Sequence, residues 1–218
     1  MAASTPDSDA TAPAGSANVG EVMQPMVSRQ YEAGVKVQVG ALLASAATFR
    51  IERSFEFLMT RLGELPLYVQ DGTQRHDGVE LSVSGHAGEA WRFVGGVQLL
   101  DAKIHDGLPS LVGKEPPAVP EFQVKLLAEY APPALDGFAI NTTLNYTGSS
   151  AFNTDNSLSI DDFFTLGAGA RYRFDANGTP VTARVAVNNL TNKKYWMPSS
   201  LLIPGAPRSI TASLAVDF

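Results

Sequence analysis

Apolar and polar residues alternate with a period of two along most of the chain. Near its end, Ile210, Leu214 and Val216 fall on one side of an extended backbone, and Ser213 and Asp217 fall on the other. This period is typical of β-strands with one apolar face, whereas an amphipathic helix has a period near 3.6. We therefore predict an all-β protein of about nine strands. The alternating segments are residues 30–39, 43–57, 79–84, 91–99, 122–130, 138–147, 164–174, 181–188 and 209–218.

The connections between these segments alternate between short and long. The short ones are rich in Gly, Asp, Asn and Pro, as hairpin turns require, and lie at 40–41, 85–88, 131–137 and 175–178. The long ones lie at about 58–72, 101–119, 148–162 and 191–206. This spacing predicts an antiparallel up-and-down meander with one plain end and one elaborate end, the arrangement of transmembrane β-barrels.

Three features favour a partial transmembrane β-barrel over a soluble β-sandwich. Several segments reach the length of about 9 to 11 residues that a membrane-spanning strand needs. Their polar sides mix charged residues with Asn, Thr and Gly, as a wet interior would allow, and we expect their apolar sides to face lipid. Aromatic residues lie towards strand ends, as in interfacial girdles, at Tyr31, Tyr68, Trp91, Tyr130, Tyr146, Tyr172, Phe174, Tyr195 and Trp196. A small porin-like barrel and a soluble sandwich acting as a binding module remain alternatives.

Composition excludes several classes of function. The net charge of −6 provides no basic field for nucleic acid, and the absence of cysteine removes thiol chemistry and disulfides. The histidines His76, His86 and His105 are scattered without metal-ligand spacing, and no Ser or Asp has a placed histidine partner. We therefore predict no enzyme activity, no catalytic residues, no metal site and no cofactor.

The first residues differ in composition from the rest of the chain. Residues 1–24 are rich in Ala, Ser, Thr, Pro and Gly without a period, and we predict a flexible loop or tail. They lack the basic start and apolar run of a signal peptide. Residues 25–218 are predicted to form the barrel part. The apolar run at 41–47 is far shorter than the roughly 20 residues of a membrane helix.

Five ordered motifs carry a resemblance to a known family. They are "SRQYEAGVK" (28–36), "DGTQRHDGVELSVSG" (71–85), "GGVQLLDAKI" (95–104), "VNNLTNKKYW" (187–196) and "GAPRSITASLAVDF" (205–218). In this order they resemble the C-terminal half of the barrel of TonB-dependent siderophore receptors. The stretch before the first motif, residues 11–28, resembles the extracellular loop that precedes the same strand in that family.

The resemblance implies a fold and a function. Members of the family have a signal peptide, a segment that contacts TonB, a plug domain and a barrel of 22 strands. We expect the present chain to supply about nine of those strands, as a C-terminal fragment or a truncated reading frame. The implied function is TonB-dependent uptake of a ferric siderophore across the outer membrane of a Gram-negative bacterium. The implied partners are outer-membrane lipid, the siderophore–iron complex, TonB and the plug through the N-terminal part, and the outer-membrane assembly machinery.

The closing strand has the features of an assembly signal. In the family, a terminal aromatic residue with apolar residues at alternating positions resembles the signal that the assembly machinery recognises. Ile210, Leu214, Val216 and Phe218 fit that arrangement. An ordinary amphipathic edge strand could also end in this way.

Two further groups of residues are candidates for function. Tyr195 and Trp196 either contact ligand at the mouth of the barrel or anchor a strand end at the membrane interface, since indole and phenol rings favour that zone. Arg171, Arg173 and Arg184 fall on the polar side of their strands. We expect them to line the lumen or to pair with carboxylates of the plug.

Overall fold

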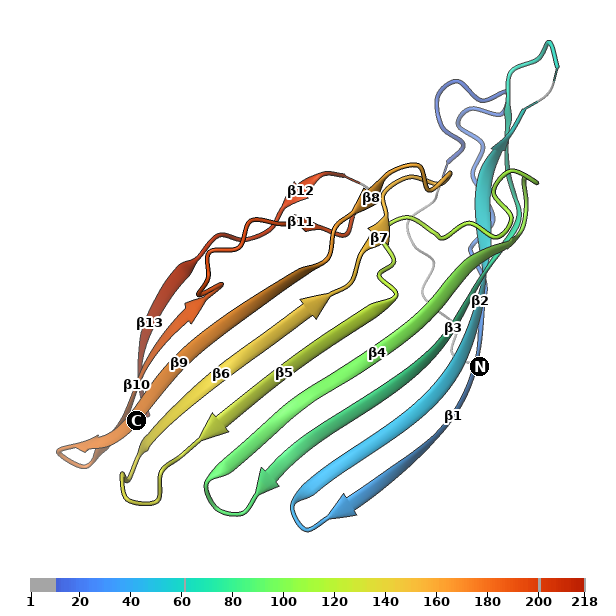
Figure 1. The fold of residues 1–218 in the computed structure, drawn as a ribbon. Coiled ribbons are helices and arrows are strands. Elements are labelled where there is room, and N and C mark those ends of the chain that lie inside the picture. The colour runs from blue at the N-terminus through green and yellow to red at the C-terminus, as the bar shows by residue number, and fades with distance from the viewer. Residues whose placement is uncertain (1–10, 61, 200, 218) are drawn as a thin grey trace.

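The computed structural model describes residues 11–60, 62–199 and 201–217, and these residues form strands and loops without a helix. Nine strands form one large sheet, and four two-residue strands form two small ladders (Figure 1). The large sheet consists of β1 (Ser28–Val39), β2 (Leu42–Met59), β3 (Leu67–Ala87), β4 (Trp91–Asp106), β5 (Phe122–Tyr130), β6 (Phe138–Thr147), β9 (Phe163–Ala176), β10 (Thr179–Asn188) and β13 (Ser209–Val216). The ladders pair β7 (Ser150–Ala151) with β8 (Ser159–Ile160), and β11 (Trp196–Met197) with β12 (Ile203–Pro204).

The large sheet is an antiparallel meander. Its order is β1-β2-β3-β4-β5-β6-β9-β10-β13, so each strand pairs with the next long strand of the chain. Figure 1 shows these strands as one curved layer. A sandwich requires two sheets packed face to face, and the described strands do not form one. The prediction of nine strands in an up-and-down meander is therefore confirmed. Within the described residues, no helix has the length and apolar character needed to cross a membrane.

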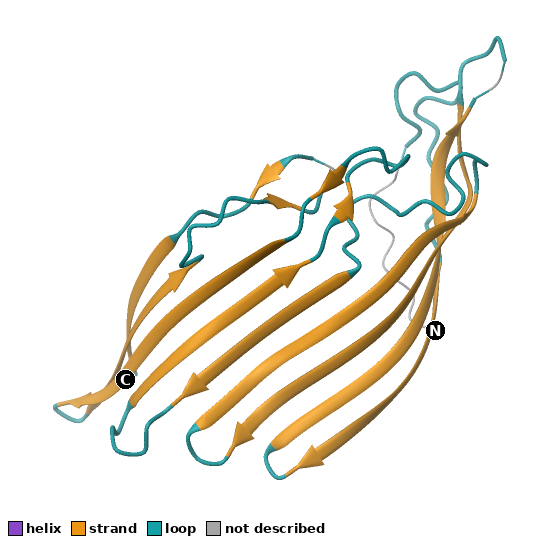
Figure 2. Cartoon of the chain, in the orientation of Figure 1, coloured by secondary structure: helices purple, strands orange, loops and turns teal. Residues whose placement is uncertain are grey.

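Short and long connections lie at opposite ends of the sheet, as the sequence predicts (Figure 2). The short-turn end has connections at 40–41, 88–90, 131–137 and 177–178. The long-connection end has connections at 60–66, 107–121, 148–162 and 189–208, which contain the small ladders. At one short turn, Asn177 and Gly178 have φ of 57° and 85°. Two left-handed residues in a row are what a type I′ hairpin turn requires.

One predicted connection is shorter than expected. Residues 58–72 were expected to form a long loop, but β2 continues to Met59 and β3 begins at Leu67. The strict alternation is lost there because the pairing of β2 with β3 is irregular between Phe55 and Phe57. A bulge moves the following residues out of the period of two, so the sequence pattern does not reveal the strand although the backbone pairing continues.

One face of the sheet carries apolar rows that cross many strands, and we call it the apolar face. Its clearest row passes from β4 to β13 through residues that are direct cross-strand partners: Trp91, Tyr130, Ile140, Ala170, Val185 and Ala212. The rings of Trp91 and Tyr130 lie 4.7 Å apart at the short-turn end. Leu81 and Leu214 also lie on this face, and Leu214 is 66% exposed. A row of this kind, unburied within the chain, suits contact with lipid.

The opposite face, which we call the polar face, carries rows of polar residues. One row follows the cross-strand partners Glu80, Gln98, Gln123 and Thr147 from β3 to β6. Gln98 donates a hydrogen bond of 2.7 Å to the Glu80 carboxylate. Rows on one face are built from different strands because successive side chains point to opposite sides.

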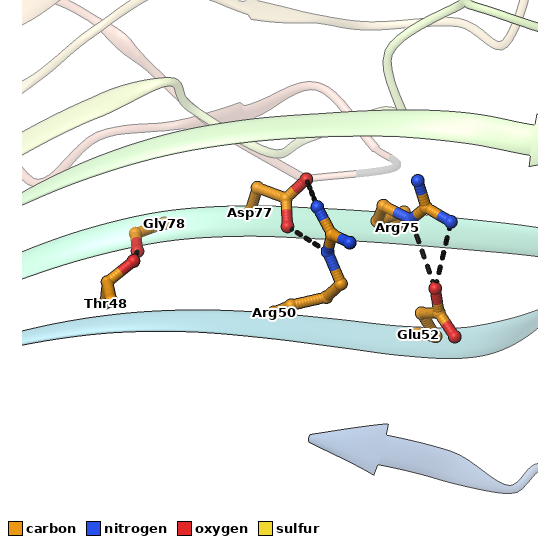
Figure 3. A network of polar contacts seen from close by, with 6 residues as sticks. All are labelled: Thr48, Arg50, Glu52, Arg75, Asp77 and Gly78. Atoms are coloured by element: carbon orange, nitrogen blue, oxygen red, sulfur yellow. Dashed lines mark hydrogen bonds and ion pairs between the residues drawn. The ribbon is translucent and has the colours of Figure 1, made fainter. Parts of the chain in front are cut away.

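In β2 and β3, towards the long-connection end, the apolar face carries charged residues and the polar face carries apolar ones. Arg50 and Asp77 lie on the apolar face, in line with Leu81, and their side chains join at 2.6 Å and 3.0 Å (Figure 3). Two residues further along β2 and β3, Arg75 Nη2 lies 3.0 Å from Glu52 Oε1. Exposed ion pairs contribute only about 0 to 1 kcal/mol each. These ion pairs therefore add little stability, but their position shows where the apolar band of this face ends.

The register also corrects the expected orientation of β2. Its apolar residues were expected to face lipid, but Phe49 is the cross-strand partner of Glu32, and Ile51 is the partner of Gln30. These apolar side chains therefore lie on the polar face. The sequence predicts the alternation in β2 correctly but assigns its apolar residues to the wrong face. Only the pairing of β2 with β1 and β3 determines which face they occupy.

A buried cluster explains why apolar residues turn to the polar face at this end. Phe55, Phe57 and Ile104 form its centre. Met59, Val69, Leu108 and Leu111 pack against it. The connection 107–121 thus folds onto the polar face, and the cluster buries its apolar side chains away from water.

We predict that Ile104→Ala destabilises the long-connection end. Ile104 has no exposed surface, and removal of a buried isoleucine side chain typically lowers the free energy of unfolding by about 2 to 5 kcal/mol. Denaturant unfolding in detergent micelles measures the change. Leu135→Ala is the matched control, because Leu135 is 54% exposed in a short turn. Equal midpoints for the two variants would refute a core at this position.

Candidate functional site

The candidate site is the long-connection end, where three long connections and the segment before β1 meet the ends of the strands (Figure 2). The segment before β1 is tied to the start of β3. The Asn18 side chain accepts a hydrogen bond from the backbone N–H of Tyr68 and donates one to its carbonyl, both at 3.0 Å. Ala17 N–H donates to the Pro66 carbonyl at 2.9 Å. The division of the chain near residue 24 stays a prediction.

Connections 107–121 and 148–162 are joined to each other. The Asn156 side chain accepts from the Glu115 N–H at 2.8 Å and donates to the Glu115 carbonyl at 2.9 Å. The Ala118 N–H donates to the Ala151 carbonyl at 2.8 Å. Burial, with the nearby carboxylate of Glu121, raises the pKa of Glu115. The two connections therefore form one hydrogen-bonded unit at the long-connection end of the sheet.

The tip of connection 148–162 is ordered by its own polar side chains. Asn153 accepts from the Leu158 N–H at 3.0 Å and donates to the Ser157 hydroxyl at 2.8 Å. The backbone N–H and the hydroxyl of Ser157 donate to the Asp155 carboxylate, and these bonds lower the pKa of Asp155. Asp155 is thus a stably ionised, exposed group at this end of the molecule.

Connection 189–208 is held by a buried asparagine. Asn189 is 6% exposed, and its side chain donates to the carbonyls of Lys193 and Ala206 and accepts from the Lys193 N–H. Its φ of 49° lies in the left-handed region, which asparagine tolerates better than most residues. This arrangement brings the two arms of the connection together ahead of the β11–β12 ladder.

The structure separates the two aromatic candidates. The Tyr195 ring stacks on Phe163 with the ring centroids 4.0 Å apart, and it also lies against Gly205, where a side chain would collide with the ring. Phe163 is the cross-strand partner of Thr147, so Tyr195 packs over the polar face. Trp196, in contrast, is 49% exposed. Tyr195 therefore packs connection 189–208 against β9, and Trp196 presents an exposed aromatic surface.

The three predicted arginines lie on the polar face, near the short-turn end. Arg171 and Arg184 are direct cross-strand partners, and Arg173 follows two residues along β9. The three arginines therefore lie at the opposite end of the sheet from Tyr195 and Trp196, which belong to the long-connection end. Sequence reasoning missed Arg92 and Glu129, which join the same group of side chains. Their strand ends are recognisable in the sequence, but their position beside Arg171 depends on the register of the paired strands.

The predicted assembly residues occupy the outer strand β13. Ile210 is 73% exposed on the apolar face and pairs with Val187. Leu214 and Val216 follow on the same face, opposite Ala183 and Val181. Phe218 lies outside the described residues.

The polar face also carries a hollow of about 580 Å³ over β1 to β5, with Glu32, Lys36, Glu80 and Lys125 among its lining residues. Among the described residues, no group of three or more His, Asp or Glu side chains is placed to hold a metal ion.

Comparison with known proteins identifies the family. A family model described as "TonB dependent receptor-like, beta-barrel" matches residues 2–190. The chain belongs to this family. The resemblance found in the sequence motifs is thereby confirmed, and so is the partial barrel. Proteins of the TonB-dependent receptor family are outer-membrane β-barrels of Gram-negative bacteria, and they are receptors and transporters.

Individual relatives of this TonB-dependent receptor chain are receptors for metal chelates. The ferrichrome receptor FcuA of Yersinia enterocolitica is 28% identical over 206 residues, which cover 92% of this chain and 27% of the relative. The metal-pseudopaline receptor CntO of Pseudomonas aeruginosa is 29% identical over 208 residues, with 91% and 29% covered. The crystal structure of BauA, the ferric preacinetobactin receptor of Acinetobacter baumannii, matches with a TM-score of 0.83 at 34% identity, covering 96% of this chain and 32% of BauA. The chain spans less than a third of these relatives.

We predict that Asn156→Ala separates connections 107–121 and 148–162. The variant loses two hydrogen bonds to Glu115 and places alanine at a φ of 57°, where a residue with a β-carbon is disfavoured. Hydrogen exchange at the amides of Glu115 and Ala118 should accelerate about 10- to 100-fold, since each lost hydrogen bond weakens the unit by roughly 1 kcal/mol. Asn156→Gly is the control that removes the bonds and relieves the backbone. Unchanged exchange in both variants would contradict the proposed unit.

Proposed function

We propose that this chain forms the C-terminal part of the barrel of a TonB-dependent outer-membrane receptor that imports a ferric siderophore. The observation that carries the proposal is the combination of the family match over residues 2–190 with relatives named for ferric siderophores. The nine-stranded meander with one elaborate end supports it. The barrel of such a receptor encloses a plug domain, and TonB, coupled to the proton gradient of the inner membrane, rearranges the plug.

The proposed mechanism divides the molecule into two ends. The long connections capture the chelate outside the membrane, and the polar face then lines its path inward. Ligand capture needs convergent polar and aromatic groups on a rigid support, and the bonded connections 107–121 and 148–162 supply such a support. Binding and conformational change complete the cycle, so we propose no covalent step and no resident cofactor.

Trp196 is the residue that we propose to contact the ligand, with Tyr195 in a supporting role. The exposed indole of Trp196 can stack on a planar part of a chelate. Tyr195, held between Phe163 and Gly205, fixes the backbone from which Trp196 projects. The closing strand has a separate proposed role, in which Ile210, Leu214 and Val216, together with Phe218, present an assembly signal to the outer-membrane machinery.

We predict that the apolar face contacts lipid and the polar face does not. The chain contains no cysteine, so single-cysteine variants can be labelled cleanly. A fluorescent label at Leu81→Cys should be quenched strongly by brominated lipid. The neighbouring Glu80→Cys is the matched control, because successive residues of a strand point to opposite faces. Equal quenching of both labels would contradict the assignment of faces.

A chimera tests the proposed function directly. Residues 11–218 replace the aligned segment of the Yersinia ferrichrome receptor, in an iron-starved strain that lacks its own hydroxamate receptors. We expect the chimera to reach the outer membrane and to restore growth on a ferric siderophore, because the chain supplies strands of the same barrel. Trp196→Ala in the chimera should weaken siderophore binding about 10-fold or more, as loss of an aromatic contact of roughly 1.5 kcal/mol would.

Two controls make the outcome interpretable. The same chimera in a strain without TonB should not restore growth, since import requires the inner-membrane energy source. A chimera that folds in the outer membrane but binds no ferric siderophore would overturn the proposed function. Restored growth without TonB would instead indicate a passive pore.

A further inference from the structure

Four arginines gather on the polar face near the short-turn end, and we call them the arginine cluster: Arg92, Arg171, Arg173 and Arg184. They line a hollow of about 410 Å³ together with Glu129, Asp217, Thr182 and Ala215. The four arginines lie in β4, β9 and β10. The two carboxylates belong to Glu129 in β5 and to Asp217, the residue after β13. It therefore lies at the end of the sheet opposite to the long connections.

The register forces positive charges together. Arg171 and Arg184 are direct cross-strand partners on β9 and β10, and Arg173 lies on the same face two residues away. Like charges that face each other across two strands destabilise a sheet. A nearby negative charge offsets this repulsion.

The carboxylates of the chain compensate only part of this charge. Glu129 receives two hydrogen bonds from Arg171, at 3.0 Å and 3.2 Å, across the small and fully buried Ala139 of β6. Asp217 is 3.8 Å from Arg173, and both side chains are more than 60% exposed. Arg184 makes no hydrogen bond or ion pair with any residue in the described ranges. Four guanidinium groups and two carboxylates line the hollow, so two positive charges remain in excess.

We propose that the arginine cluster is a binding site for an oxyanion, a carboxylate or a phosphate, held chiefly by Arg184 and Arg173. A guanidinium group presents a planar fork of N–H donors that matches both kinds of anion, and such charge-assisted bonds are among the strongest in proteins. Arg171 is already engaged with Glu129. The site lies on other strands than Trp196, and binding of an oxyanion there needs no iron chelate, so it can be tested separately from siderophore import.

The oxyanion has two possible sources, which direct titration distinguishes. The source is either an acidic polypeptide segment lying on the polar face or a free small anion. The full chain in detergent micelles is titrated with inorganic phosphate and, separately, with a pentaglutamate peptide, and binding is followed by calorimetry and by the midpoint of thermal unfolding. A ligand that binds only the folded state raises that midpoint.

Arg184→Gln is the decisive variant, and Arg29→Gln is its matched control, since Arg29 lies in β1 and carries the same charge. Binding should weaken about 10- to 100-fold in Arg184→Gln, the effect of losing a hydrogen bond to a charged group, and should stay unchanged in Arg29→Gln. Arg184→Lys, which keeps the charge and loses the fork, should fall between. Binding of the peptide alone or of phosphate alone supports the site and identifies the source.

Stability without ligand provides a second test. Because Arg184 faces Arg171, removal of its charge should leave the unfolding midpoint unchanged or raise it, relative to Arg29→Gln. A lower midpoint would show that Arg184 is a structural residue and would overturn the proposal. The proposal also fails if the wild-type chain binds neither probe, or if Arg184→Gln and Arg29→Gln weaken binding equally.

Discussion

The hydrogen-bonded register between neighbouring antiparallel strands is the constraint on which the rest of this structure depends. Because side chains alternate with a period of two, a slip by one residue would move every side chain of a strand to the other face. The register places Phe49 opposite Glu32, and it places Arg50 beside Asp77 in line with Leu81. Those pairings determine which surfaces can meet lipid and where the apolar band ends.

The two ends of the sheet follow from this register in different ways. At the long-connection end, apolar residues of β2 and β4 turn to the polar face and are covered by residues of connection 107–121. The connections there are held by asparagine side chains at positions 156 and 189, which satisfy backbone groups that no strand pairs. At the short-turn end, tight turns leave the polar face open, and the register concentrates charge on it.

Much of the fold was predictable because a strand with one apolar face has a local signature. The nine strands, the meander and the alternation of short and long connections all follow from it, and five motifs indicated the family. The start of β3 at Leu67 was not predictable, since a bulge near Phe55 breaks the period of two. The packing of Tyr195 on Phe163 was also not predictable, because the two residues are 32 positions apart and meet only when connection 189–208 folds back over β9.

The sequence by itself determined the strands and their order as a meander, since alternation and turn residues act over short distances. Its five motifs resembled those of the TonB-dependent receptor family, and the family match confirmed the membership. Only the tertiary structure decided which face each row of side chains occupies, because strand pairing sets it and the single strand does not. For the same reason Arg92 and Glu129 joined Arg171 only in the folded sheet. Side chains from β4, β5 and β9 become neighbours through the register of the paired strands, which no local pattern records.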